Sequence, residues 1–86
     1  MTVEIFCHVY RSSRKENLYI YVAASEGFDR VPKELMVQFG EPERALSLLL
    51  TPEKRLARED PVIVIENLKA KGYHLQLPPA DDRFGE

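Results

Sequence analysis

The chain has one cysteine, no tryptophan and only four glycines among its 86 residues. A single cysteine cannot form a disulfide within the chain, a pattern that fits a reducing compartment. The glycines stand far apart, so the glycine-rich loops that cradle phosphate groups are absent from the sequence. These shortages exclude a disulfide scaffold and a P-loop nucleotide-binding protein.

Long apolar runs and a charge excess are missing too. No run approaches the roughly 18 apolar residues that cross a membrane, and the start, MTVEIF, does not resemble a secretion signal. Twelve Lys and Arg stand against 14 Asp and Glu, a net charge of −2. A general basic field for nucleic acid is therefore excluded, although a local patch is not. We expect a cytoplasmic protein without a membrane partner.

The length suits one small domain with a two-layer core. The scaling of stability with length gives a free energy of unfolding on the order of 4–13 kcal/mol. We expect this domain to cover residues 1–79 and to end at a diproline. Residues 80–86 are predicted to form a flexible acidic tail.

Residues 3–22 are predicted to form a β-hairpin that organises the rest of the chain. Segments 3–10 and 17–22 each alternate small aliphatic side chains with rings or polar groups, which places the two sets on opposite faces of a strand. The polar residues 11–16 between them are long enough for a loop and contain no Gly or Pro for a two-residue turn. The aliphatic face is expected to point into the core.

The register that keeps like side chains together pairs Tyr10 with Asn17, and therefore Phe6 with Tyr21. The rings of the hairpin then share the face opposite the aliphatic one. Aromatic cross-strand pairs add about 0.2–1 kcal/mol each. The members of this expected aromatic face are Phe6, His8, Tyr10, Tyr19 and Tyr21.

Two helices are predicted from their end signals. The first lies between Pro32 and Gly40, and the second covers residues 61–71, between an Asp60 cap and the stop at Gly72. The β-branched run at the start of the second segment favours a strand instead. Its length and end signals decide for a helix.

Three further strands complete the predicted fold. Residues 44–50 are expected to be a central strand because both faces are apolar. Residues 55–58 are expected to be a short charged edge strand, and residues 73–77 the last strand. The order is ββαββαβ, an α+β fold with a mainly antiparallel sheet and two helices packed on one of its faces.

Several short stretches form an ordered pattern along nearly the whole chain. They are Phe6, Tyr10-Arg11-Ser12-Ser13, Leu18-Tyr19-Ile20-Tyr21-Val22, Phe28, Arg30-Val31-Pro32, Glu34-Leu35-Met36, Phe39-Gly40, Pro42, Gly72-Tyr73 and Leu75-Gln76-Leu77-Pro78-Pro79. This pattern resembles the YcgL domain family of small bacterial proteins, found mainly in gammaproteobacteria. The resemblance implies a compact α+β domain of cytosolic bacterial origin, and it brings no activity with it.

The aromatic face and the basic loop beside it are the expected contact surface. Rings on a sheet with cations at the rim can stack and neutralise single-stranded RNA. The hydroxyls and cations of the loop could equally hold a phosphate or an acidic peptide. Flat packing of the tyrosines beside a solvated loop is the simpler interpretation, which the near-neutral charge favours. The residues expected to bind are Tyr10, Arg11, Ser12, Ser13, Arg14, Lys15, Tyr19 and Tyr21.

Catalysis and metal binding have little support in the sequence. Cys7 and His8 are adjacent on one strand, so they point to opposite faces and cannot form a nucleophile–base pair. Cys7 is expected to be a buried, inert thiol. His8 and His74 lack the short paired spacing of a metal-ligand set. We expect no catalytic residue, no metal and no cofactor.

A second apolar surface is expected at the start of the helix over residues 61–71. Val62 and Ile63 spread around the helix, away from the face that one sheet could cover. They are either a partner or dimer site, or they are covered by another segment. The sequence leaves both readings open.

Together these features predict a non-enzymatic binding module. A protein partner is preferred over RNA because the net charge is slightly negative. The alternative is an enzyme acting on a small anionic substrate held by the Arg11–Lys15 loop. A pocket beside that loop with a strongly perturbed titratable residue would favour the enzyme, and an open aromatic patch would favour the module.

Overall fold

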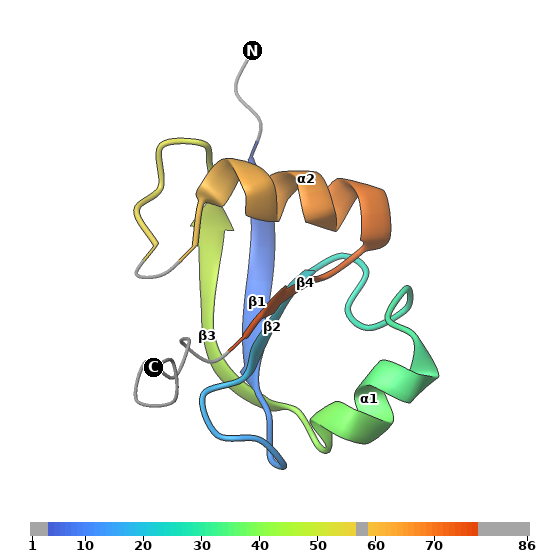
Figure 1. The fold of residues 1–86 in the computed structure, drawn as a ribbon. Helices are drawn as coiled ribbons and strands as arrows, with labels where there is room; N and C mark the ends of the chain where they lie inside the picture. The colour runs from blue at the N-terminus through green and yellow to red at the C-terminus, as the bar shows by residue number, and fades with distance from the viewer. Residues whose placement is uncertain (1–3, 57–58, 78–86) are drawn as a thin grey trace, which may run out of the picture.

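The computed structural model describes residues 4–56 and 59–77. Their elements follow the order ββαβαβ (Figure 1): β1 (Ile5–Arg11), β2 (Tyr19–Ala23), α1 (Lys33–Phe39), β3 (Glu43–Leu50), α2 (Pro61–Lys71) and β4 (His74–Gln76). The α+β class with an antiparallel sheet and two helices is confirmed. The diproline and the tail predicted over residues 80–86 lie outside the described residues.

The strand predicted at residues 55–58 is not found in its described part. Arg55 and Leu56 belong to the loop that joins β3 to α2, and residues 57 and 58 lie outside the described range. The loop begins with a turn in which the Lys54 amide donates to the Thr51 carbonyl at 3.0 Å. The chain therefore passes from β3 to α2 without a further strand in the described part of this connection.

The sheet is antiparallel throughout, in the order β3-β1-β2-β4. The prediction that residues 44–50 form a central strand was wrong, because β3 lies at an edge. Leu50 is buried, whereas Leu46 and Leu49 remain about half exposed at 49% and 45%. Apolar side chains on both faces of a strand therefore do not require a strand on both sides.

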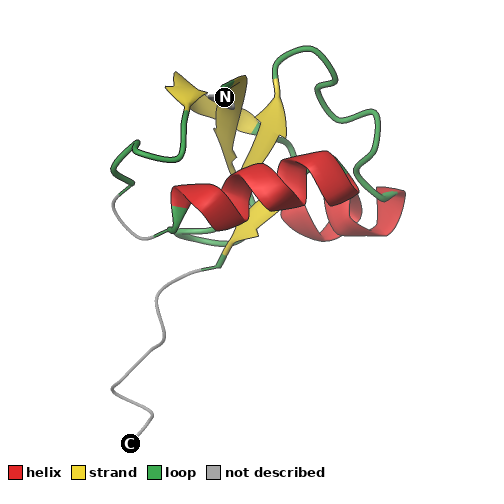
Figure 2. Cartoon of the chain, turned by 90° about the horizontal axis from the view of Figure 1, so that it is seen from above, coloured by secondary structure: helices red, strands yellow, loops and turns green. Residues whose placement is uncertain are grey.

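The two helices cover opposite faces of the sheet, so the prediction that they share one face was wrong. Residues of α2 share a core with the face of β1 that carries Cys7 and Val9. Phe39 of α1 shares a core with Ile20 and Val22, whose side chains point to the other face. Figure 1 shows α2 at one end of the sheet and α1 at the other, and Figure 2 looks down on α2 lying across the strands.

The hairpin register differs from the predicted one by three positions. Tyr21 lies opposite Val9 rather than Phe6, and Tyr10 lies opposite Ile20. A shift by an odd number exchanges the two faces of β2 relative to β1. The loop lies later in the sequence than the predicted residues 11–16, because β1 extends to Arg11 and β2 begins only at Tyr19.

The ends of α2 follow from the residues that flank it. The carboxylate of Asp60 accepts a hydrogen bond from the Val62 amide at 2.9 Å, and Gly72 ends the helix in the left-handed conformation at φ 90°. The bounds match the prediction, so end signals outweighed the β-branched run. The helix runs from Pro61 to Lys71.

Replacing Asp60 by alanine should lower the free energy of unfolding by about 1 kcal/mol, because the Val62 amide loses its acceptor. Urea unfolding of the two proteins measures the difference. Glu66→Ala, at an exposed position within α2, is the control and should change stability by less than about 0.5 kcal/mol. Equal losses in both variants would contradict the capping role.

Candidate functional site

The tyrosines of the hairpin do not share one face, so the predicted aromatic face does not form. Tyr10 lies on the α1 side, where its ring is 4.8 Å from that of Phe28. Tyr19 and Tyr21 lie on the α2 side, since Tyr21 pairs with Val9. The physical reason is the three-position shift, which moves the rings of β2 to the aliphatic side of β1.

A row of rings does remain on β1 itself. Phe6 and His8 have ring centroids 5.6 Å apart, and His8 and Tyr10 have centroids 6.2 Å apart. The Nδ1 atom of His8 is hydrogen bonded to the hydroxyl of Ser47 on β3 at 2.6 Å. This row is part of the predicted face, without the two tyrosines of β2.

The two serines of the hairpin loop are used within the fold. The buried hydroxyl of Ser12 donates to the Phe39 carbonyl at 2.5 Å and accepts from the amides of Arg14 and Lys15. The hydroxyl of Ser13 accepts from the Glu41 amide at 2.8 Å. Both serines therefore join the hairpin to the end of α1, and these contacts account for them without a bound phosphate.

The basic residues of the loop are also separated. Arg11 donates to the carboxylate of Glu43 at 2.9 Å, and this hydrogen bond holds the pKa of Arg11 above its ordinary value. Arg14 and Lys15 lie on the α1 side, beside a shallow pocket of about 400 Å³ that also contacts Leu35. The structure thus does not gather the eight predicted binding residues at one place.

A larger pocket lies on the α2 side of the sheet, between the hairpin and the loop after β3. Its volume is about 770 Å³. We call it the tyrosine pocket, because Tyr19 and Tyr21 of the predicted set belong to it. Its lining residues are Val9, Asn17, Tyr19, Tyr21, Ala45, Leu46, Ser47, Leu48, Lys54, Arg55, Leu56 and Gln76.

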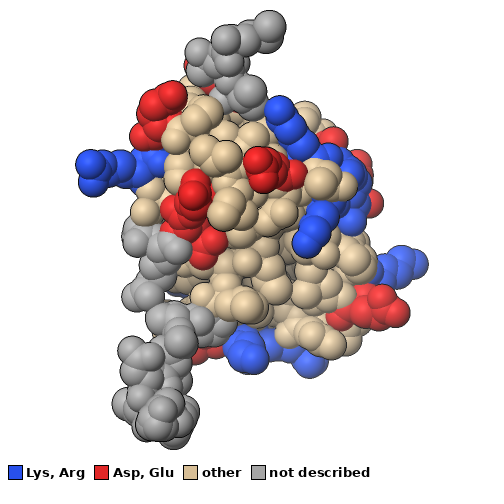
Figure 3. Space-filling model, turned by 45° about the horizontal axis from the view of Figure 1, so that its top comes forward, with Lys and Arg blue, Asp and Glu red and all other residues tan. Residues whose placement is uncertain are grey.

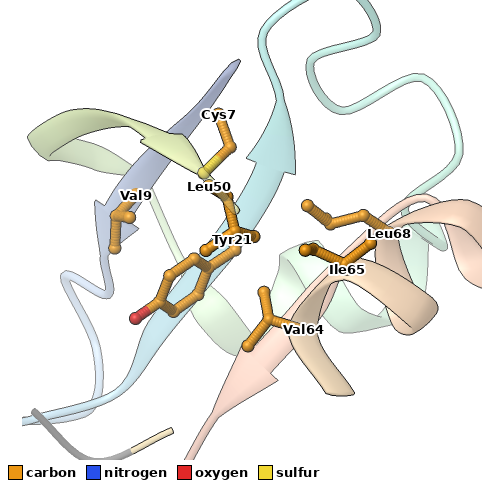
Figure 4. Close-up of a cluster of buried hydrophobic side chains, with 7 residues drawn as sticks. All are labelled: Cys7, Val9, Tyr21, Leu50, Val64, Ile65 and Leu68. Atoms are coloured by element: carbon orange, nitrogen blue, oxygen red, sulfur yellow. The ribbon is translucent and has the colours of Figure 1, made fainter. Parts of the chain in front are cut away.

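Tyr21 connects the tyrosine pocket to the core. Its ring lies in the cluster with Val9 and Val64, and its hydroxyl points away from the side chains of α2 (Figure 4). That hydroxyl donates to the side-chain oxygen of Gln76 at 3.0 Å. Burial raises the pKa of Tyr21 to about 12, and the negative charge of Glu59 adds to the effect. Tyr21 is thus protonated at neutral pH and serves as a donor rather than a base.

The charged lining of the tyrosine pocket is of one sign. Lys54 and Arg55 come from the loop after β3, are both exposed, and have no acidic residue beside them among the lining residues. The lining also includes the apolar side chains of Leu46 and Leu48 of β3. The pocket therefore combines exposed cations with hydroxyl, amide and leucine side chains.

His74 holds the loop before α2 against β4. The side-chain amide nitrogen of Asn67 can only donate, so the Nδ1 atom of His74, 2.9 Å away, is the acceptor. The Nε2 hydrogen of His74 is then donated to Glu59 at 2.6 Å. Both ring nitrogens are engaged in a largely buried side chain. This arrangement positions the loop and leaves no free imidazole nitrogen for catalysis.

Cys7 is fully buried in the core on the α2 side, as predicted. Burial raises the pKa of its thiol to about 11, which makes the nucleophilic thiolate rare at neutral pH. Among the described residues, no group of three or more His, Cys, Asp or Glu side chains could hold a metal ion. Neither helix of the described chain has the length and apolar character that crossing a bilayer requires.

The surface charge is mixed on the face shown in Figure 3. Lys and Arg appear there together with Asp and Glu, with uncharged surface between them. A nucleic-acid interface usually presents a continuous basic stripe. This face shows no such stripe among its described residues.

Lys54, Arg55 and Gln76 are site residues that the sequence interpretation missed. Arg55 was expected in a short edge strand and Gln76 in the last strand, and none of the three belongs to the predicted binding set. Pairing of Tyr19 with Gln76 across β2 and β4 brings these distant segments to one pocket.

Comparisons with known proteins confirm the resemblance found in the sequence. A sequence model of the YcgL domain matches residues 7–79. A YcgL domain-containing protein of Pseudomonas fluorescens SBW25 is 49% identical over 80 residues, which are 93% of this chain and 82% of that protein. One of Pseudomonas putida W619 is 51% identical with the same coverage. One of Stutzerimonas stutzeri A1501 is 46% identical over 84 residues, 98% of this chain and 87% of that protein.

Proposed function

The chain belongs to the YcgL domain family, and from this premise and the pocket geometry we propose that it is a non-enzymatic binding module. Its ligand site is the tyrosine pocket. The ligand is a segment of a partner protein that presents an acidic group beside an apolar side chain. The contact surface thus keeps Tyr19 and Tyr21 of the predicted set and adds residues of β3 and of the loop after it.

The observation that carries the proposal is the lining of the pocket. Lys54 and Arg55 attract an acidic group, and their exposure lets a partner reach them. Leu46 and Leu48 offer apolar surface, and the half-buried Tyr19 belongs to the same lining. Pockets that bind ligands commonly combine an apolar lining with a few polar groups that fix orientation.

The chemistry of the titratable groups favours binding over catalysis. Tyr21, a buried residue of the pocket lining, has a pKa raised to about 12. His74, next to Tyr21 at a ring distance of 5.6 Å, uses both nitrogens within the fold. An enzyme acting at this pocket would need a base or nucleophile active near neutral pH. Tyr21 keeps its proton at neutral pH, and His74 has no ring nitrogen free to contact a substrate.

A pair of matched peptides tests the proposal. The acetylated, amidated peptide Glu-Phe-Glu-Phe should shift the amide NMR signals of Tyr19, Tyr21, Lys54, Arg55 and Gln76. The neutral peptide Gln-Phe-Gln-Phe should bind at least fivefold more weakly, because it lacks the charges that the two cations attract. Phenylacetate, as a second probe, shows whether a small carboxylate suffices without a peptide.

The cations are tested by removing their charge. The double variant Lys54→Gln, Arg55→Gln should weaken binding of the acidic peptide about tenfold, a loss of about 1.4 kcal/mol. Lys33→Gln, at an exposed position on α1, is the control and should bind as the parent does. If the acidic peptide causes shifts only away from the pocket, or if the double variant binds unchanged, the proposal is wrong.

A further inference from the structure

The outer edge of β3 is an open strand edge. β3 (Glu43–Leu50) is the outermost strand, so it pairs with β1 on one side only. Its outward-facing backbone groups have no strand partner in the part of the chain that the structure describes. With eight residues it is the longest of the described strands. An exposed edge of this kind is a template for another strand.

The second half of this edge lacks the usual protection. The charges of β3 are Glu43 and Arg44, and its register irregularity lies near them, opposite Val9 and Tyr10. Residues 46–50 contain neither a charge nor a proline. The other edge strand, β4, has only three residues and is protected by its shortness.

Apolar side chains flank the open edge on both faces of the sheet. Leu46 is 49% exposed on the α2 side. Leu49 and its cross-strand neighbour Phe6 are 45% and 52% exposed on the α1 side. A strand added to this edge would cover side chains on both faces and satisfy the backbone groups between them.

We propose that the occupant is a second copy of this chain, bound through its own β3 edge. The two strands run antiparallel about a two-fold axis and join two four-stranded sheets into one. An uncharged, leucine-rich edge is best complemented by another uncharged apolar strand, because a charged partner would be desolvated without compensation. Residues 46–50 are such a strand, and two-fold pairing satisfies both open edges at once.

The size of a standard interface sets the area that such a dimer would have to cover. A standard interface covers about 800 Å² per partner, roughly an eighth of the 5969 Å² surface of this chain. The edge strand with Phe6, Leu46 and Leu49 supplies its centre. Val62 and Ile63, 43% and 50% exposed, are further apolar side chains on the surface. They belong to the first turn of α2, which begins near the end of β3 (Figure 1).

Measurement of the mass in solution tests this dimer. Sedimentation equilibrium at rising concentration should show a change from 9.9 kDa to twice that mass. Hydrogen exchange should slow at alternate amides of residues 46–50 as the dimer forms. A constant monomer mass up to several hundred micromolar, with unchanged exchange in β3, would overturn the proposal.

A matched pair of lysine variants locates the interface. Leu49→Lys should raise the dimer dissociation constant at least tenfold, because it places a charge beside the pairing strand. Val37→Lys makes the same kind of change at a position of α1 that is 67% exposed, and it should leave the constant unchanged. A dimer that survives Leu49→Lys and is broken by Val37→Lys would also overturn the proposal.

The dimer and the peptide site can fail separately. Leu49 is not among the lining residues of the tyrosine pocket. Leu46 belongs to both surfaces, so Leu49→Lys, which frees it, should bind the acidic peptide at least as tightly as the parent if it retains the parent's circular dichroism spectrum. Unchanged peptide binding in the Lys54→Gln, Arg55→Gln variant, with the dimer intact, would refute only the proposed function.

Discussion

Replacing Phe39 by alanine should lower the free energy of unfolding by about 3–5 kcal/mol. Phe39 is fully buried and is the last residue of α1. It packs in the cluster with Leu18, Ile20 and Val22, on the side of the sheet that α1 covers. This loss is a large part of the total free energy of unfolding, which is on the order of 4–13 kcal/mol for a chain of this length.

Two features explain why removing the Phe39 ring should lower stability so much. A helix of seven residues is marginal alone, so α1 depends on the side chains by which it docks. The Phe39 carbonyl also receives the buried hydroxyl of Ser12, so a shift of the helix end would disturb the hairpin loop. Loss of the ring should therefore destabilise two elements together.

Urea unfolding of Phe39→Ala and of the parent measures this effect. Val37→Ala, on the exposed side of the same helix, is the control and should change stability by less than about 1 kcal/mol. A cost below 1 kcal/mol for Phe39→Ala would show that α1 does not dock through this ring.

Raising the pH from 8 to 11 should destabilise the parent by about 2–3 kcal/mol more than Cys7→Ala. The pKa of the Cys7 thiol rises from its ordinary 9.0 to about 11 on folding, because burial disfavours the thiolate. When the folded and unfolded pKa values differ by one pH unit, the free energy of unfolding changes by about 1.4 kcal/mol.

The direction follows from proton binding in the two states. Below about pH 9 the thiol keeps its proton in both states, so it contributes no pH dependence to the free energy of unfolding there. Between about pH 9 and 11 the unfolded chain loses the proton and the folded chain retains it, so the unfolded state is favoured progressively. Stability is therefore lost as the pH rises.

Comparison with Cys7→Ala isolates the thiol from other groups. Tyr21, whose pKa is also raised, to about 12, contributes in both proteins alike. Unfolding by urea at several pH values should show the parent and the variant converging in stability toward pH 11. A constant difference across the whole range would mean that the thiol reaches water in the folded state.

Local signals in the sequence predicted most of the elements. The Asp60 cap and the Gly72 stop predicted the bounds of α2, and Gly40 marked the end of α1. Alternation within β1 also separated Cys7 and Val9 correctly from Tyr10. These features depend on a few neighbouring residues, so they can be recognised without knowledge of the tertiary structure.

The hairpin register could not be predicted in the same way. Sorting side chains by parity assumes that one face of the sheet is open to water. Here α1 covers one face and α2 the other, so aliphatic Ile20 and aromatic Tyr21 are both buried, on opposite sides. Parity alone does not choose between registers when both faces are packed.

The wrong register also made the predicted binding site partly wrong. The sequence pointed to Tyr19 and Tyr21, which do line the tyrosine pocket, but it joined them to Tyr10 on the other face. Lys54 and Gln76 reach the pocket only through the loop after β3 and the pairing of β4 with β2. Such contacts arise from tertiary structure and leave no local signal in the sequence.

Nuclear Overhauser contacts across the hairpin test the register, on which the tyrosine pocket depends. We expect backbone contacts between Val9 and Tyr21 and between Tyr10 and Ile20, with the ring of Tyr21 close to Val64 of α2. Backbone contacts between Phe6 and Tyr21 instead would return both β2 tyrosines to the face of Tyr10, and the tyrosine pocket would not exist.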